Sequence, residues 1–234
     1  LSLAKKFWPG PLTLILKKKL YSNISPMVSN NSEWVGCRIP NNNIALKLLN
    51  SVNFPIAAPS ANMNTKTSVT LLEDLDPTLK KEIFTIDDGS SILGLESTVI
   101  KTGNKEIDIL RLGSLTEEEI NKKILDCKIN TRPSILSPGN QLKHYSPKKQ
   151  LRINIEKVEN DEGLLNFGLN KLKSKIFNLN LSEDSDLIEA SNKFYHYLNL
   201  MDKSNCKKIA VAPIPSQGLG KVINDRLKRA TFIE

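Results

Sequence analysis

Short apolar runs of the kind found in β-strands recur along the first half of the chain, separated by stretches with helical spacing. The predicted strands are LTLILKK (12–18), VGCRIP (35–40), FPIAA (54–58), IFTID (83–87), STVIK (97–101) and IDILRL (107–112). Helices are predicted at 43–52 and at 68–75, where Ser68 is a natural N-cap. A third helix is predicted over 117–125, because Thr116 and Glu119 form a capping-box pattern.

The last third of the chain resumes this alternation. Strands are predicted within 151–155, 174–181 and 207–215, and a closing helix over 218–230. A long amphipathic helix is predicted over 184–202, and one face of it collects Leu187, Ala190, Phe194, Leu198 and Met201. Three strands and two helices in so short a stretch predict a small Rossmann-like domain.

The chain is therefore expected to be an α/β (α+β) protein of two domains joined by a linker. Residues 127–150 hold three prolines and show little periodicity, as linkers do. The predicted organisation is a first domain over 1–126, the linker over 127–150 and the Rossmann-like domain over 151–234.

Composition limits the kinds of partner that the chain can have. The net charge of +8 suits an anionic partner such as ATP or RNA, although the scattered lysines also fit a simple compositional bias. The three cysteines are far apart and only two histidines are present, so neither disulfides nor a zinc site is expected. The chain has no signal-peptide pattern, and no apolar run reaches the roughly 20 residues that span a bilayer. These features predict a cytoplasmic protein with reduced thiols.

The stretch APSANMNTKTSVT (58–70) follows a predicted strand and is dense in neutral hydrogen-bonding side chains. At the carboxyl end of a strand, such groups bind phosphate, ribose or carboxylate oxygens without repulsive charge. They equally fit an Asx-turn and a capped helix, in which the side chains satisfy their own backbone. The pattern alone leaves both interpretations open.

Two arginines, Arg38 and Arg111, lie near the ends of predicted apolar strands, and Ser97 opens the strand that precedes Arg111. If the last two strands pair as a hairpin, Arg111 lies where a guanidinium can bind an anion through two hydrogen bonds. A surface salt bridge of Arg111 with Asp108 or Glu117 is the alternative. No nucleophile–base pair or glycine-rich phosphate loop is present, so no residue is predicted as a covalent catalyst. An enzyme of this kind would act by holding and polarising anionic substrates.

Several ordered segments together resemble the YrdC-like domain of L-threonylcarbamoyladenylate synthases. They are FWPGPLTLIL, VGCRIPNNNIALKLL, PIAAPSAN, TSVTLLEDL, DDGSSILGLESTVI and ILRLGSLTEEEI. SPGNQLKHYSP is similar to the linker of the longer, Sua5-type members, and IAVAPIPSQGLGKVINDRLKRA is similar to the end of their C-terminal Sua5 domain. The resemblance implies a twisted mixed-sheet domain followed by a small Sua5 domain.

The resemblance also implies an activity and a set of binding residues. Family members condense ATP, bicarbonate and L-threonine to threonylcarbamoyl-AMP and pyrophosphate, and the activated group is transferred by downstream proteins to adenosine 37 of tRNAs. ATP is a substrate, accompanied by Mg²⁺, and no protein metal site is implied. By motif position, the threonine-binding residues are Arg38, Ser60 and Ser97. The residues implied for ATP are Asn62, Thr70, Arg111 and Tyr145, the last closing over the nucleotide from the linker.

This chain departs from the family pattern at several points. Trp34 stands where members commonly have a small hydroxyl residue, and Leu112 stands where a Pro is usual. Members also carry an earlier segment with a Lys-x-Arg motif that binds the triphosphate. We therefore expect this chain alone, as an N-terminally shortened form, to bind ligands weakly and to be poorly active.

Two other functions remain open at this point. A non-catalytic module that binds tRNA or double-stranded RNA would account for the positive charge, and it would show a steep salt dependence. A related carbamoyl transferase is the second alternative, because YrdC-like domains also occur in hydrogenase maturation factors. The Sua5-type tail argues against that second alternative.

Overall fold

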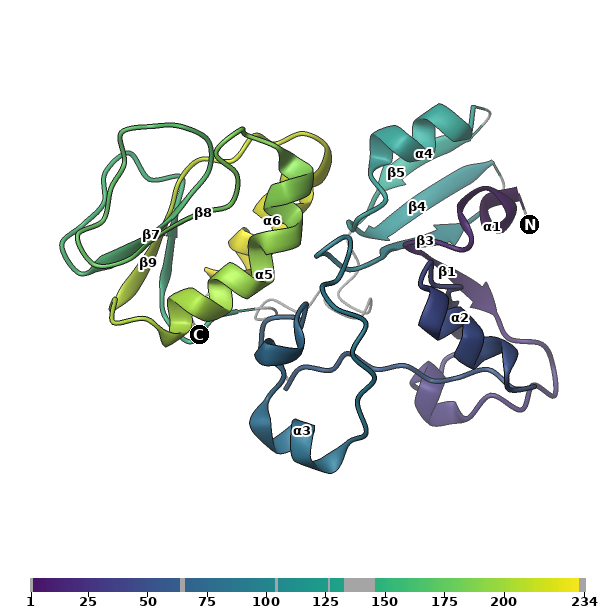
Figure 1. Cartoon of the computed structure of the whole chain (residues 1–234). Helices are drawn as coiled ribbons and strands as arrows, with labels where there is room; N and C mark the ends of the chain where they lie inside the picture. Colours follow the sequence, from purple (N-terminus) through teal and green to yellow (C-terminus); the bar gives the residue numbers. More distant parts are fainter. Residues whose placement is uncertain (1, 64–65, 104, 126, 133–145, 232–234) are drawn as a thin grey trace. The chain divides into compact units, whose positions relative to one another are not determined.

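The computed structural model describes residues 2–63, 66–103, 105–125, 127–132 and 146–231 (Figure 1). The chain forms two compact units. Unit 1 comprises residues 1–59 and 96–140, and unit 2 comprises residues 60–95 and 141–234. Each unit contains its own β-sheet, so that the α+β class predicted for the chain is confirmed.

Unit 1 is built on a mixed five-stranded sheet. In spatial order its strands are β2 (Trp34–Cys37), β1 (Leu12–Lys17), β3 (Thr98–Thr102), β4 (Glu106–Arg111) and β5 (Lys128–Thr131). The β1–β2 and β3–β4 pairs are antiparallel, whereas β1–β3 and β4–β5 are parallel. The predicted pairing of strands 97–101 and 107–112 as a hairpin is confirmed by β3 and β4. Strand β5 lies within residues 127–150, which were expected to form the linker.

The core of unit 1 lies on one face of this sheet, beneath α1 (Ser2–Phe7) and α4 (Glu117–Lys123). It contains Leu3, Phe7, Leu12, Leu14, Ile100, Ile107, Ile109, Leu115, Ile120 and Ile124. The predicted capping box is present at the start of α4, because the side chains of Thr116 and Glu119 each bond the other's backbone N–H. The helix predicted over 43–52 is α2 (Asn43–Asn50), which Asn42 caps through its side chain.

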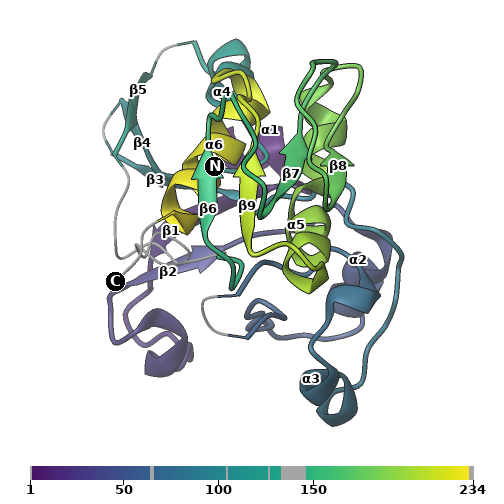
Figure 2. The ribbon, with the colours of Figure 1, turned by 90° about the vertical axis from the view of Figure 1, so that its left-hand side faces the viewer.

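Unit 2 contains a four-stranded sheet in which every recorded strand pair is parallel. In spatial order the strands are β6 (Leu151–Ile153), β9 (Lys208–Val211), β7 (Glu162–Asn166) and β8 (Asn178–Asn180) (Figure 2). The long helices α5 (Leu187–Lys203) and α6 (Gly218–Ala230) pack against each other and against this sheet. A small Rossmann-like arrangement is therefore confirmed, with β7 as a strand that the apolar pattern did not reveal.

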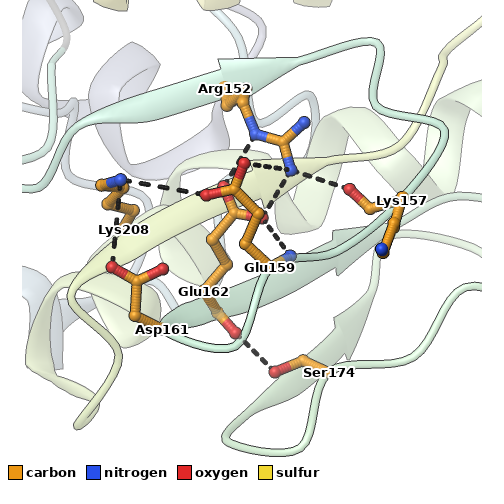
Figure 3. A network of polar contacts seen from close by, with 7 residues as sticks. All are labelled: Arg152, Lys157, Glu159, Asp161, Glu162, Ser174 and Lys208. Carbon is orange, nitrogen blue, oxygen red and sulfur yellow. Dashed lines mark hydrogen bonds and ion pairs between the residues drawn. The ribbon is translucent and has the colours of Figure 1, made fainter.

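Figure 3 shows a polar network around Glu162, the first residue of β7. Arg152 Nε and Nη2 donate to the two carboxylate oxygens of Glu162 at 2.8 and 2.7 Å, and the Glu162 side chain is fully buried. These hydrogen bonds, assisted by the backbone N–H of Glu159, lower the pKa of Glu162 against the opposing effect of desolvation. The network thus keeps a buried carboxylate charged within the sheet.

Residues 60–95 contain little regular structure. The segment forms the short 3₁₀ helix η2 (Leu72–Asp74) and α3 (Pro77–Glu82), which Asp76 caps. The predicted helix over 68–75 is wrong, as are the predicted strands at 54–58 and 83–87, whose residues are exposed and irregular. An apolar run becomes a strand only when another strand accepts and donates its backbone hydrogen bonds, and neither run has such a partner among the described residues.

Candidate functional site

Three polar side chains converge on unit 1 where β3 begins and β4 ends. Arg111 Nε and Nη2 donate to the Ser97 carbonyl oxygen at 3.2 and 2.8 Å, and Nη2 also lies 3.1 Å from Ser97 Oγ. Ser97 Oγ in turn lies 2.7 Å from Thr13 Oγ1 of β1. Thr13, Ser97 and Arg111 form what we call the arginine–serine cluster. Its hydroxyls and guanidinium are the groups that bind carboxylate or phosphate oxygens.

Arg38 adds a second positive charge to this region. It follows β2, and partial desolvation and the neighbouring charge of Arg111 both lower the pKa of Arg38. Arg38 as a whole nevertheless remains exposed to solvent. Two guanidinium groups that repel each other favour an anion between or beside them, because the anion offsets both charges.

A close backbone crossing fixes Ser97 beside Arg111. A Cβ atom on Gly113 would lie 2.4 Å from the Glu96 oxygen and from the backbone of Ser97 and Thr98, so only glycine fits there. The Ser114 N–H donates to the Glu96 oxygen at 2.8 Å, and Thr98 Oγ1 donates to the Leu115 oxygen at 2.5 Å. The start of β3 is therefore held by the turn that follows β4.

In the polar stretch of unit 2, which begins at Ser60, the local backbone satisfies only part of the side-chain hydrogen bonding. Asn62 Nδ2 donates to the carbonyl oxygens of Met63 and Lys66 at 3.1 and 3.0 Å, so the side chain bonds nearby backbone. Asn62 Oδ1 and Thr70 Oγ1, however, are buried without a hydrogen-bond partner among the described residues. Because such atoms are costly to bury unpaired, local turn formation does not account for the whole pattern.

The predicted site residues thus fall into two groups. Arg38, Ser97 and Arg111 lie near one another in unit 1, whereas Ser60, Asn62 and Thr70 belong to unit 2. Tyr145 lies outside the described residues.

Thr13 was missed by sequence reasoning. A usable signal existed, because the alternation of buried Leu12 and Leu14 with Thr13 places the hydroxyl on the face of the sheet opposite the core.

The described residues offer no clustered set of metal ligands near these side chains. Among the described residues, no group of three His, Cys, Asp or Glu side chains gathers closely enough to hold a metal ion. All three cysteines are free, with Cys206 buried and Cys37 and Cys127 half-buried. Burial raises the pKa of the Cys37 thiol, which keeps it protonated and a poor nucleophile. No described helix is long and apolar enough to cross a bilayer.

Comparison with known proteins assigns the family. A family described as "Telomere recombination", which groups Sua5, YciO and YrdC sequences, matches residues 1–113. The family described as "Threonylcarbamoyl-AMP synthase, C-terminal domain" matches residues 115–231. The two matches follow one another along the chain and together include almost all of it.

Individual relatives agree with these matches. The threonylcarbamoyl-AMP synthases of Pyrococcus abyssi and Bacillus subtilis are each 31% identical to this chain over 98% of its length and 72% of theirs. The crystal structure of P. abyssi Sua5 with L-threonine superposes with a TM-score of 0.84 at 29% identity, over 98% of this chain and 72% of that one. These comparisons do not favour a non-catalytic RNA-binding module. The chain belongs to the Sua5-type threonylcarbamoyl-AMP synthases, transferases of the pathway that makes threonylcarbamoyladenosine in tRNA.

Proposed function

We propose that this chain binds L-threonine and ATP, and that with bicarbonate it forms threonylcarbamoyl-AMP and releases pyrophosphate. The observation that carries the proposal is the arginine–serine cluster together with Arg38, since every substrate of this reaction is an anion or carries a carboxylate. The L-threonine present in the related P. abyssi structure supports the choice of amino acid.

The binding roles that we propose follow the motif positions of the family. Arg38, Ser60 and Ser97 bind threonine, with the guanidinium on its carboxylate and the hydroxyls on its polar atoms. Asn62, Thr70, Arg111 and Tyr145 bind ATP. The buried, unpaired oxygens of Asn62 and Thr70 support this second assignment, because a bound nucleotide would supply the missing hydrogen bonds.

Rate acceleration in this proposal comes from positioning and charge. The threonine amine and bicarbonate combine as a carbamate with loss of water. The carbamate oxygen attacks the α-phosphorus of ATP, and pyrophosphate leaves with the electrons of the broken P–O bond. Arg38 and Arg111 offset the negative charge that accumulates between carbamate and triphosphate. The described residues do not fit a dedicated metal cage, so a Mg²⁺ ion would be held by phosphate oxygens and water.

The wider setting is also part of the proposal. We expect the product to pass to a transferase that modifies tRNA, in the cytoplasm, where free cysteines such as these stay reduced. The domain boundaries at 126/127 and 150/151 stay a prediction.

Titration calorimetry with L-threonine and ATP, separately and together, tests the proposal. We expect threonine to bind the chain and ATP to tighten that binding. Arg111→Ala should weaken binding by about tenfold or more, since a charge-assisted hydrogen bond contributes roughly 1.5–3 kcal/mol.

The matched control is Arg132→Ala. This residue makes an exposed ion pair with Asp108 at 3.5 Å, beside the same strand, so its loss should leave both affinities unchanged. A folded wild-type chain that binds neither ligand would refute the proposal.

A further inference from the structure

The irregular segment 66–95 is attached to helix α5 through side-chain contacts. Thr67 Oγ1 donates to Asn199 Oδ1 at the start of the segment. His196 Nδ1 lies 3.0 Å from Asp74 Oδ2 in its first third, and Ser191 Oγ donates to the Leu93 carbonyl oxygen at 3.3 Å near its end. We call these three contacts the α5 clasp. All three come from one helix, on which Ser191, His196 and Asn199 lie five and three residues apart.

The central contact is the most specific of the three. The Asp74 side chain is fully buried, and the His196 side chain is only 16% exposed. Glu73 approaches His196 Nε2 at 3.5 Å from the same 3₁₀ turn, so the imidazole bridges two consecutive carboxylates. A buried carboxylate is costly without a hydrogen-bonded partner, and His196 is the partner recorded for Asp74 Oδ2. The contact therefore favours one docked position of η2.

Gly94 shows that the end of the segment is pressed against α5. Its φ of +59° is a left-handed conformation, and a Cβ atom there would lie 2.0 Å from the Ser191 carbonyl oxygen. No bulkier residue fits at this crossing. The same helix thus contacts the segment at Thr67, at Asp74 and at Leu93 and Gly94.

We propose that α5 positions the substrate-binding segment, with His196 and Asn199 as its positioning residues. The proposal rests on the function proposed above, in which Asn62 and Thr70 bind ATP. Thr70 lies between the Thr67 and Asp74 contacts, and the hydrogen bonds of Asn62 lead to Lys66, next to Thr67. Because the segment has little regular structure of its own, these contacts restrict its conformations before ligand binds.

We expect substitution of His196 or Asn199 to change the affinity for ATP without changing the rate of the chemical step. His196 and Asn199 do not contact the reacting atoms in this proposal, so their loss should raise the dissociation constant and KM for ATP and leave kcat unchanged. Arg111 and Ser97 lie in unit 1, and contacts within their cluster should be unaffected.

Hydrogen exchange of the full chain, followed by ATP titration, tests the inference. In His196→Ala we expect amides within 66–95 to exchange at least fivefold faster and ATP to bind at least fivefold more weakly. His196→Gln can still donate to Asp74 and should restore most of both quantities. Asn199→Ala tests a second contact should His196→Ala fail to fold. Glu189→Gln removes a half-exposed ion pair of the same helix with Lys193 and is the matched control.

The outcomes separate this inference from the proposed function. Unchanged exchange within 66–95 in both His196→Ala and Asn199→Ala would overturn the clasp. Faster exchange with unchanged ATP and threonine affinities would overturn the positioning role and leave the proposed function intact. A folded wild-type chain that binds neither ligand would refute the proposed function, and the positioning role with it.

Discussion

The two groups of candidate binding residues are held in place in different ways. The arginine–serine cluster of unit 1 lies on paired strands and is locked by a backbone crossing at Gly113. The polar stretch of unit 2 lies in irregular backbone and depends on side-chain contacts with α5. The backbone hydrogen bonds of the sheet preorganise the first group, and breaking them requires unfolding of the strands. The second can loosen locally at a smaller free-energy cost.

The largest effect should come from Gly113→Ala, which disrupts the backbone crossing that holds the arginine–serine cluster of unit 1. The new Cβ would collide with three backbone atoms at 2.4 Å, and backbone cannot move aside as a flexible side chain can. We expect unit 1 to lose about 3 kcal/mol of unfolding free energy, at the upper end for overpacking. Urea denaturation followed by circular dichroism measures it.

Gly103→Ala is the control for this change. A Cβ on Gly103 meets no atom within 4 Å, so the unfolding free energy should stay within about 0.5 kcal/mol of wild type. Equal stability of the two variants would show that the crossing is not the constraint that holds Ser97.

Acid pH should affect the scaffold of unit 2 selectively. Arg152 lowers the pKa of Glu162 in the folded protein, so this pair contributes stability at pH values above the ordinary carboxyl pKa of about 4.3. That contribution is lost as the pH falls further, through the depressed folded pKa, because the folded state must then take up a proton. We expect Glu162→Gln to cost about 2 kcal/mol at pH 7, less than a fully buried pair because Arg152 is 41% exposed.

The diagnostic feature is the pH dependence. The difference in unfolding free energy between wild type and Glu162→Gln should shrink below pH 4, as the wild-type carboxyl protonates. Asp161→Asn, which removes only a 3.9 Å ion pair with Lys208, should show no such convergence. A difference that stays constant from pH 7 to pH 3 would contradict the assignment.

The same contrast explains which features could be predicted from the sequence. Strands β1 to β4, β6, β8 and β9, the capping box at Thr116 and the long helix α5 were predicted because local patterns and caps determine them. Strands β5 and β7 were not predicted. The hairpin that joins Ser97 to Arg111 followed from two adjacent strands. The helix predicted over 68–75 is wrong because Ser68 does not begin a helix there. Contacts with α5 determine the backbone conformation of these residues instead. Contacts separated by more than a hundred residues, such as Asp74 with His196, leave no periodic signal.

Glu162 shows a second kind of failure. A strand that opens with a carboxylate does not look like a buried strand, because burial of that group depends on Arg152 from another strand. The predicted strands 54–58 and 83–87 show the converse, since their apolar side chains resemble those of a buried strand, yet Phe54 and Phe84 are 62% and 92% exposed. Apolar character indicates where burial is possible, and strand partners decide whether it occurs.

The smallest effect should come from Phe84→Ser. Phe84 is almost fully exposed in irregular backbone, so removing its ring takes away little buried area. We expect the unfolding free energy to change by less than about 0.5 kcal/mol, while binding of a hydrophobic dye such as anilinonaphthalene sulfonate decreases. Leu75→Ala in the same irregular segment is the contrast, since Leu75 is only 6% exposed and its truncation should cost about 2 kcal/mol or more. If Phe84→Ser proved as costly as Leu75→Ala, the segment would be packed in solution, and its contacts with α5 would not be its main constraint.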